Sequence, residues 1–171
     1  MPDNATDNQT YTYPYMVWTF MNERDLGWLE GIIDGEGCLM LGRCHRVRGK
    51  TGKKYISWLP ILTITNTDMR IIERAKEIIG CGSIVAHPMS SPNWKQAYRL
   101  TINSNGLRRL LPMLELVGKQ GQRNLLLEAL RSIGKGRNHT DHPKVQRIYI
   151  EIRKLNKKGP IDGQSSRHTD Y

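Results

Sequence analysis

The chain has 171 residues, of which 38% are hydrophobic and 25% are charged, and its formal net charge is +10 at pH 7. This length and composition favour one soluble globular domain, and no stretch approaches the roughly 18 apolar residues of a membrane span. The polar, acidic N-terminus lacks the basic and then apolar segments of a secretory signal. We therefore expect an intracellular protein without a membrane partner, in a compartment that the sequence does not identify, and the positive charge favours a polyanionic partner.

The first half of the chain predicts a helix, a β-hairpin and a second helix. The expected elements are a partly disordered aromatic arm over 1–20, a helix over 23–35, strands over 37–47 and 55–66, and a helix over 68–79. Pro60 within the second strand predicts an edge position or a bulge, because proline cannot donate to a β-ladder. Gly80 and Gly82 end the second helix.

The second half repeats the hairpin and continues with helices. The expected elements are strands over 83–87 and 94–103, a helix capped by Ser104 and disturbed at Pro112, a helix over 119–133, a helix capped by Asp141 and ending near 157, and a mobile tail over 158–171. This order predicts a single α+β domain over 21–157, in which helices cover one face of an antiparallel four-stranded sheet. The other face of the sheet is left open.

Charge is sorted along the chain. Residues 37–67 and 78–114 contain no Asp or Glu but several Lys and Arg, whereas the acidic residues lie mainly in the expected helices. Because the acid-free segments include the expected strands, we expect the open face of the sheet to be basic. A solvated surface with no polyanionic partner would mix its charges.

Three scattered cysteines, Cys38, Cys44 and Cys81, indicate free thiols in a reducing compartment. Together with His45 they leave a zinc site open as an alternative, although the chain has no CxxC or HxxxH spacing. None of the cysteines has a convincing base partner, so covalent catalysis is not expected.

Three glycines form one stripe along the first helix. Gly27, Gly31 and Gly35 recur every four residues, and each costs about 1 kcal/mol relative to alanine inside a helix. Close approach of a second helix would explain them, whereas a poor helix that frays into a loop is the alternative. If the second helix is a copy of the first, the three glycines form a dimer interface.

Asp34 and Glu36 lie at the C-terminal end of this helix, where the helix dipole disfavours anions. Two copies packed along the glycine stripe would bring their Glu36 side chains together, and converging carboxylates repel unless a cation neutralises them. Hard oxygen ligands with retained water suit Mg²⁺, which can polarise a phosphate and activate water. A solvated helix end is the alternative.

Residues 29–37, LEGIIDGEG, resemble the LAGLIDADG motif of homing endonucleases nearly position by position. The departures are Glu30 for a small residue, Gly35 for alanine and Glu36 for the metal-binding aspartate. The order of elements over 23–157 is also similar to the family's αββαββα core. The chain contains one copy of the motif, which in this family implies a homodimer.

The resemblance implies an intron-encoded, sequence-specific endonuclease that hydrolyses both strands of double-stranded DNA at a long, pseudo-palindromic site. Its cofactor would be Mg²⁺ or Mn²⁺, and Ca²⁺ would bind without supporting cleavage. Two alternatives on the same scaffold stay open. One is an RNA-splicing maturase, for which RNA is a partner, and the other is a catalytically inactive DNA-binding protein.

The resemblance also assigns roles to individual residues. Glu36 corresponds to the metal ligand, to which the Gly35 carbonyl contributes, and Asn66, Arg70 and Lys119 correspond to catalytic residues near the scissile phosphate. Asn66 also suits a cap of the helix that follows it, and Lys119 also suits a solvated position at a helix start.

In this family the open face of the sheet reads DNA. Strand alternation, with Trp58 and Leu62 pointing inward, selects the outward positions. Arginines there suit guanine edges, and lysines at the hairpin turn suit phosphates. The side chains expected to contact DNA are Cys44, Arg46, Arg48, Lys50, Lys53, Lys54, Ser57, Thr63, His87, Lys95, Arg99 and Thr101.

Overall fold

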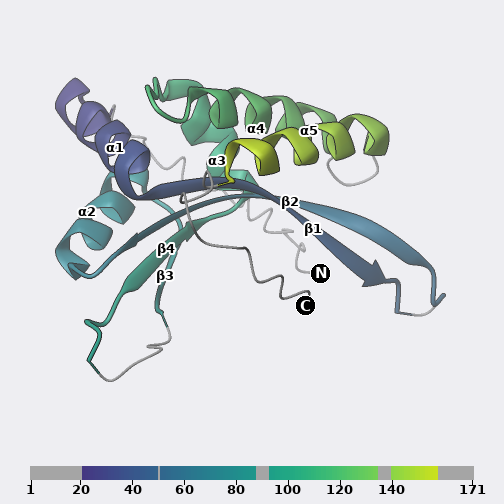
Figure 1. The fold of residues 1–171 in the computed structure, drawn as a ribbon, viewed down its shortest axis with the longest axis horizontal. Helices are drawn as coiled ribbons and strands as arrows, with labels where there is room; N and C mark the ends of the chain where they lie inside the picture. The colour runs from purple at the N-terminus through teal and green to yellow at the C-terminus, as the bar shows by residue number, and fades with distance from the viewer. Residues whose placement is uncertain (1–20, 50, 88–92, 135–139, 158–171) are drawn as a thin grey trace, which may run out of the picture.

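Four antiparallel strands form one sheet, with the helices arranged over one of its faces (Figure 1). The computed structural model describes residues 21–49, 51–87, 93–134 and 140–157. Its elements in chain order are α1 (Glu23–Glu36), β1 (Gly37–Val47), β2 (Lys54–Asn66), α2 (Met69–Ile79), β3 (Ser83–Ala86), β4 (Tyr98–Ile102), α3 (Ser104–Leu110), the short 3-10 helix η1 (Leu111–Met113), α4 (Gln120–Ser132) and α5 (His142–Leu155). The predicted arm, the predicted tail and Lys50 lie outside the described residues. Within those ranges, every helix is too short or too polar to span a bilayer.

The sheet has the strand order β1-β2-β4-β3 and is antiparallel throughout. In the long β1–β2 hairpin, Gly37 pairs with Ile64 at one end and Val47 pairs with Lys54 at the other. β4 pairs with the end of β2 on one side and with β3 on the other. The predicted α+β class, with two hairpins joined into a four-stranded sheet, is confirmed.

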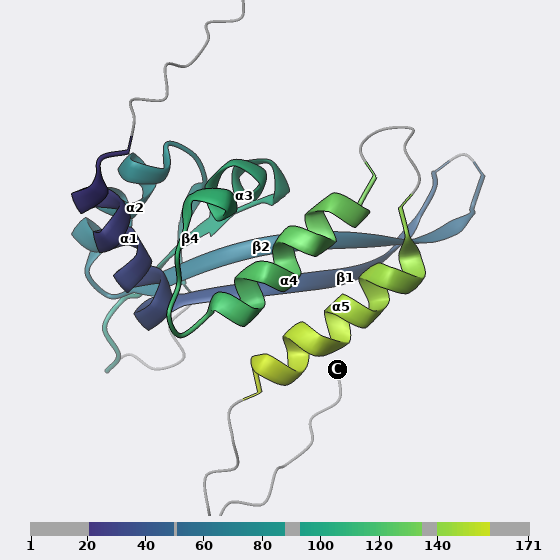
Figure 2. The same ribbon diagram turned by 90° about the horizontal axis from the view of Figure 1, so that it is seen from above.

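Alternate residues of the strands build the core on the helical face of the sheet. The strand residues buried there are Leu39, Leu41, Trp58, Leu62, Ile64, Leu100 and Ile102. Burial of each large apolar side chain is worth roughly 1.5–3 kcal/mol, so this alternation decides which face the helices cover. α4 and α5 lie side by side across β1 and β2, while α1, α2 and α3 cover the other end (Figure 2). The inward positions predicted for Trp58 and Leu62 are confirmed.

α5 is tied to the sheet near both of its ends. The Trp58 indole N–H donates to Nδ1 of His142 at 3.1 Å, and the Trp58 ring centroid lies 5.8 Å from that of Tyr149. Beyond the C-terminal end of α5, the side-chain amide of Asn156 donates to the Leu39 carbonyl at 2.8 Å. These bonds fix the helical layer relative to the β1–β2 hairpin.

Two prolines, Pro60 and Pro112, mark places where a regular element changes. Pro60 pairs with Leu41 of β1, in a part of β2 that β4 does not reach. β2 is therefore an edge strand at this point, as predicted, and the missing proline N–H is tolerated there. Pro112 lies in η1, where α3 gives way to a 3-10 turn, which agrees with the disturbance expected in this helix.

The element ends agree with the sequence prediction in some places and differ in others. Asp141 caps α5 as predicted, and Asp68, expected as the first residue of α2, is its cap. The cap of α3 is Asn103, whose side-chain oxygen accepts two backbone N–H groups at 3.1 and 3.4 Å, so the prediction of Ser104 is wrong. Both residue types cap well, so the pattern does not separate these neighbours. β4 begins only at Tyr98, because residues 93 and 94 form a turn and a bend and residues 95–97 are irregular.

Gly37, which ends the motif, is required by a close approach between the end of α1 and the start of β1. A Cβ built on it would lie 2.6 Å from the carbonyl oxygen of Ile33 and 2.9 Å from the Cα of Ile33. Both atoms belong to the backbone, so the chain itself would have to shift. Gly37→Ala should therefore destabilise the fold by about 1–3 kcal/mol.

The measurement is urea unfolding followed by tryptophan fluorescence at one fixed protein concentration. Gly49→Ala is the matched control, because its added Cβ would meet no atom within 4 Å. The stability of this control should stay within about 0.5 kcal/mol of the wild type. Equal unfolding midpoints for the two variants would contradict the close approach at Gly37.

Candidate functional site

The side chains of α1 fall into four stripes, because residues four apart lie nearly above one another on a helix. The four stripes have different surroundings, and the stripe of Leu29 and Ile33 is buried in the core. The other three stripes are Gly27, Gly31 and Gly35; Trp28, Ile32 and Glu36; and Glu30 and Asp34. These three build the candidate site.

The glycine stripe is open. All three glycines are exposed, and a Cβ built on any of them would meet no atom of residues 21–49, 51–87, 93–134 or 140–157 within 4 Å. α1 is continuous from Glu23 to Glu36, and it is capped by Asn22, whose side chain accepts from the N–H of Asp25 at 2.8 Å. The alternative in which this helix frays into a loop is therefore wrong. A bare stripe of backbone is available to a second helix.

The acidic stripe binds the segment that precedes α4. Glu30 Oε1 accepts from the N–H of Glu115 at 2.6 Å. One turn later, the two carboxylate oxygens of Asp34 accept from the N–H groups of Val117 and Lys119 at 2.8 and 3.0 Å. Asp34, the first of the two acids at the end of the motif, is therefore used in hydrogen bonds that hold the fold together. Glu36, the second acid, makes no such bond to the described residues.

Lys119 lies against the C-terminal end of α1. Its Nζ donates to the carbonyl oxygen of Ile33 at 2.9 Å and also to that of Asp34. The last carbonyls of a helix have no partner inside it, and the last turn of α1 has no basic residue of its own. Lys119 supplies this cation, so it is not the solvated helix-start residue of the alternative interpretation.

Glu36 is the last residue of α1 and is exposed. On the same stripe, the ring of Trp28 lies 5.1 Å from the guanidinium carbon of Arg74, which is on α2. Glu36 continues the stripe of Trp28 and Ile32 at the end of α1, next to the glycine stripe. Within the described part of the chain, the Glu36 carboxylate has no hydrogen bond and no ion pair.

The sheet register brings the end of β2 to the same corner. Gly37, directly after Glu36, pairs with Ile64, and Asn66 follows two residues later. Asn66 therefore lies beside the end of α1. Three of the predicted catalytic residues, Glu36, Asn66 and Lys119, gather around this helix end although they are far apart in the sequence.

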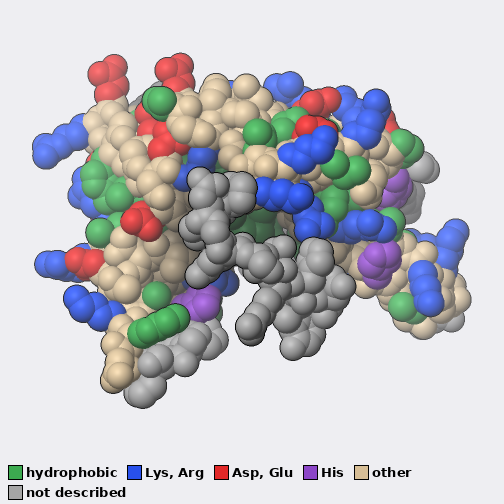
Figure 3. Space-filling model, in the orientation of Figure 1, with side chains coloured by type: hydrophobic (Ala, Val, Ile, Leu, Met, Phe, Trp, Pro, Cys, Tyr) green, Lys and Arg blue, Asp and Glu red, His purple; other side chains and the backbone are tan. Residues whose placement is uncertain are grey.

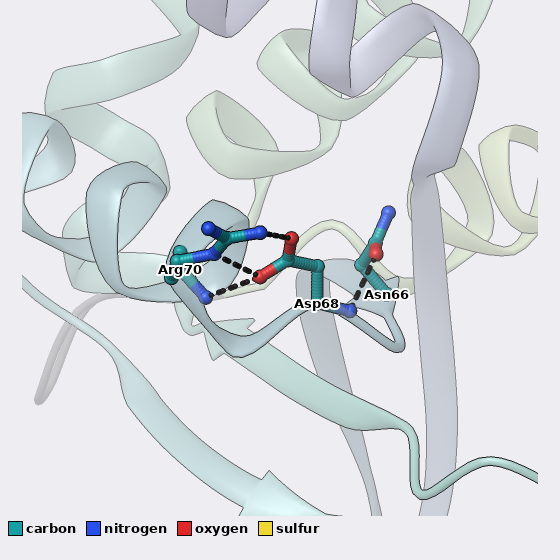
Figure 4. Close-up of polar contacts among 3 residues, drawn as sticks. All are labelled: Asn66, Asp68 and Arg70. Carbon is teal, nitrogen blue, oxygen red and sulfur yellow. Dashed lines mark hydrogen bonds and ion pairs between the residues drawn. The ribbon is translucent and has the colours of Figure 1, made fainter.

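A chain of hydrogen bonds joins Asn66 to Arg70 at the start of α2 (Figure 4). Asn66 Oδ1 accepts from the backbone N–H of Asp68 at 2.8 Å. The Asp68 carboxylate accepts from the backbone N–H and Nε of Arg70, both at 3.0 Å, and from its Nη2 at 2.6 Å. The oxygen of Asn66 thus holds the turn before α2. This role is close to the alternative stated for Asn66, a cap of the helix that follows it. Its side-chain nitrogen makes no hydrogen bond to the described residues.

The Asp68–Arg70 pair is the ionic feature that the sequence interpretation missed. The side-chain hydrogen bond from Arg70, followed by the Arg70 backbone N–H, holds the pKa of Asp68 below its usual value. The same side-chain bond raises the pKa of Arg70. The guanidinium of the predicted catalytic Arg70 is therefore already paired. A pair at this spacing is formed by the local turn, which helix propensity does not reveal.

The donor set at this corner fits one end of a Mg²⁺ site. Glu36 offers an unengaged carboxylate, and the Gly35 carbonyl belongs to the helix end whose carbonyls lack helical partners. Among the described residues, no group of three or more His, Cys, Asp or Glu side chains could hold a metal ion together. The described residues therefore supply only part of the ligands that such an ion takes.

The alternative zinc site is not assembled. Cys44 and His45 are consecutive residues of β1, so their side chains point to opposite faces of the sheet. Cys38, Cys44 and Cys81 are free cysteines. The set of four ligands proposed for zinc thus belongs to different surfaces.

The open face of the sheet carries most of the strand residues predicted to contact DNA, whereas Lys54 lies at a position of the opposite face. Cys44 pairs with Ser57, and Thr63 pairs with Thr101, on positions that alternate with the buried ones. The other predicted residue of β4, Arg99, pairs with Thr65 of β2. These residues therefore share one face. The same face also carries side chains that the sequence interpretation did not select, namely Met40, Tyr55, Leu59, Ile61, Thr65, Ser83 and Val85.

The hairpin end carries exposed basic side chains. Arg46 lies near the end of β1, and Arg48 closes the turn by donating its N–H to the Lys53 carbonyl at 2.9 Å. Lys53 and Lys54 are exposed. In Figure 3 the visible surface of this end shows Lys, Arg and His side chains, whereas most of the visible acidic ones lie over the helices.

Two further residues predicted to bind DNA lie around the second hairpin. His87 directly follows β3, and its backbone N–H donates to the Ala97 carbonyl at 2.8 Å. Lys95 is exposed in the segment before β4. Figure 1 shows the two hairpins sloping away from the helices on either side, so the sheet forms an arch whose inner face is the open one.

Solved structures of homing endonucleases share this arrangement. The archaeal intron-encoded homing endonuclease I-Vdi141I, complexed with DNA, is 20% identical over 82% of this chain and 89% of that chain, with a TM-score of 0.64. I-CvuI, in complex with the I-CreI target, is 20% identical over 85% and 89%, with a TM-score of 0.57. The LAGLIDADG homing endonuclease I-LtrWI, bound to target DNA, is 18% identical over 91% and 47%, with a TM-score of 0.55.

This chain has the fold of the LAGLIDADG homing endonucleases. The family predicted from residues 29–37 is confirmed at the level of the fold. Neither a protein-family model nor a curated protein sequence matches the chain. The likeness therefore rests on the architecture, in which α1 carries the motif and the open sheet face lies opposite the helices.

The Asp68–Arg70 pair makes a prediction about titration. Because the pKa of Asp68 is lowered in the folded protein, its ionised form stabilises the fold above the unfolded value of about 3.9. This contribution is lost as the pH falls through the folded pKa. Arg70→Ala should raise the pKa of Asp68 towards 3.9 but leave part of the lowering, because the backbone N–H of residue 70 still donates.

The pKa of Asp68 is read from the pH dependence of its side-chain carboxyl ¹³C shift. Arg131→Ala, which removes an exposed arginine from α4, is the control and should leave the Asp68 titration unchanged. An Asp68 pKa that is the same with and without the Arg70 side chain would show that the pair is not formed in solution.

Proposed function

We propose that this chain is a sequence-specific double-strand DNA endonuclease that uses a divalent metal ion and acts as a homodimer through α1. The observation that carries the proposal is Glu36, a carboxylate without a partner on the described chain, which lies next to an exposed glycine stripe at the end of the helix that leads into β1. The fold shared with DNA-bound homing endonucleases supports the same activity.

The glycine stripe supports dimerisation through α1. None of the residues that the structure describes covers Gly27, Gly31 or Gly35, and three exposed helical glycines cost stability without a packing partner. The chain spans 89% of I-CvuI and I-Vdi141I but only 47% of I-LtrWI and 45% of I-SmaMI. The chain therefore corresponds to nearly all of the first two proteins but to about half of the other two. This difference supports our proposal that a second copy of the chain completes the site.

Dimerisation along the glycine stripe would bring two Glu36 carboxylates together, because Glu36 lies on the stripe next to the glycines. Their mutual repulsion would be relieved by a divalent cation with oxygen preference. Mg²⁺ is the cofactor that we propose, with Mn²⁺ as a substitute and Ca²⁺ as an ion that binds without supporting cleavage. When bound, the metal would stabilise charge on the phosphate and activate water.

The other residues of the corner would act on the DNA. Lys119 would hold positive charge near the scissile phosphate, and the free side-chain nitrogen of Asn66 would donate to the phosphate or to the attacking water. Arg70 would be limited to an electrostatic role, since Asp68 already occupies its guanidinium.

The arched sheet face would read a long, pseudo-palindromic site, one half per protomer. Arg46 and Arg99 would contact base edges, and Lys53 and Lys54 would contact phosphates. The proposed substrate places the protein inside the cell, in whichever compartment holds its target DNA. An RNA-splicing protein or a binding-only protein on this scaffold would bind nucleic acid without cutting duplex DNA.

Gly31→Leu tests the dimer. Since a Cβ at Gly31 would meet no atom of the described part of the chain within 4 Å, the variant should fold, yet two helices could no longer approach closely. Sedimentation should give about twice 19.7 kDa for the wild type and 19.7 kDa for the variant. Glu73→Leu, an exposed change on α2, should remain dimeric. A wild type that is monomeric even on DNA would overturn the dimer.

Glu36→Gln tests the nuclease activity. The change keeps the shape of the side chain but removes two charges per dimer, so the cleavage rate should fall by far more than the tenfold that about 1.4 kcal/mol represents. DNA binding should persist, because the basic face is unchanged. Glu73→Gln is the matched control and should cut at the wild-type rate.

The substrate is duplex DNA selected from a randomised library by binding to the wild-type protein in Ca²⁺. Cleavage is then started with Mg²⁺ or Mn²⁺, and affinity is measured separately in Ca²⁺. A Glu36→Gln variant that cuts like the wild type would remove Glu36 from the metal site. A wild type that binds the selected duplex but never cuts it would make the chain a binding protein.

A further inference from the structure

We propose that Glu30 is a positioning residue, which holds the segment 114–119 in register on α1 and so keeps the Lys119 ammonium at the helix end beside Glu36. The motif that residues 29–37 resemble has a small residue at this position, which offers no acceptor. The glutamate is therefore a feature of this chain. The inference rests on the proposed function for its effect on cleavage, but the register itself is measurable without cleavage.

The register follows from a match between two spacings. Glu30 and Asp34 are one helical turn apart, which is about 6 Å along α1. Glu115 and Val117, whose N–H groups they accept at 2.6 and 2.8 Å, are two residues apart, which is about 6.6 Å in extended chain. Alternate N–H groups of the segment therefore meet successive carboxylates of the helix.

The other side of the segment is held by the core. Leu114 and Leu116 are buried, whereas Glu115 and Val117, which alternate with them, are exposed. Burial fixes which way the segment faces, but apolar contacts are not directional. The hydrogen bonds to α1 are directional, so Glu30 and Asp34 set its position along the helix.

Lys119 depends on that position, because it ends the segment. Its backbone N–H donates to Asp34 at 3.0 Å, and its Nζ donates to the carbonyl of Ile33 at 2.9 Å. Glu30 lies upstream of both contacts and touches neither Lys119 nor Glu36 in the bonds described. It therefore acts through the segment and not on the reacting atoms.

Two substitutions separate the hydrogen bond from the charge. Glu30→Ala removes the acceptor, whereas Glu30→Gln keeps an oxygen that can accept from the Glu115 N–H. The single-turnover cleavage rate of Glu30→Ala should fall by about two- to tenfold, the range that one such hydrogen bond spans. Its affinity for the selected duplex should not weaken. Glu30→Gln should cut at nearly the wild-type rate, as should the charge control Glu73→Ala.

A double-mutant cycle with Lys119→Ala tests the route of the effect. If Glu30 acts through Lys119, then Glu30→Ala should slow cleavage in the wild type but not in the Lys119→Ala background. An equal slowing in both backgrounds would overturn the proposal, as would a Glu30→Gln variant as slow as Glu30→Ala.

Amide hydrogen exchange tests the register independently of cleavage. In Glu30→Ala the amides of Glu115, Val117 and Lys119 should exchange faster, while those of α4 should not change. Unchanged exchange at all three amides would overturn the proposal even if cleavage slows. If the wild type does not cut DNA, the proposed nuclease fails, and faster exchange at these amides alone would still support the positioning of Lys119 by Glu30.

Discussion

Lys119 donates its ammonium protons to the carbonyl groups at the end of α1, and the candidate site depends on this contact. A helix end exposes several unpaired carbonyls and a partial negative charge, yet this one must carry the Glu36 carboxylate. A cation from a distant part of the chain makes that placement tolerable. Asp34, by binding the backbone on either side of Gly118, keeps the cation in place. The motif helix and the start of α4 are therefore one structural unit.

α1 can leave its glycine stripe uncovered because contacts on its other sides hold the helix in place. Leu29 and Ile33 are fully buried, Trp28 stacks near Arg74 of α2, and the acidic stripe binds the segment before α4. Three sides of the helix are thus fixed within the chain. The orientation of α1 therefore does not depend on a partner. The glycine stripe, on the fourth side, is left available for contact with one.

Much of the fold could be predicted because it is periodic. The alternation that buries Leu39 and Leu41 also places Cys44 on the opposite face, so the open face of the sheet followed from the strand pattern alone. The choice between Asn103 and Ser104 as the cap of α3 could not be predicted, since both residue types are good helix caps. Glu115, the hydrogen-bond partner of Glu30, lies 85 residues away in the sequence. No local sequence pattern predicts a contact over that separation. The Asp68–Arg70 pair is local, but it depends on how a turn closes and not on propensity.

The β1–β2 hairpin extends beyond the helical layer, and its last residues contribute little to the core (Figure 2). Surface side chains of this kind change stability by only about 0.5 kcal/mol when substituted. The surface that would recognise a target is therefore largely independent of the parts that keep the chain folded. Single substitutions could therefore accumulate at this end of the hairpin one after another, while each variant remains a folded molecule.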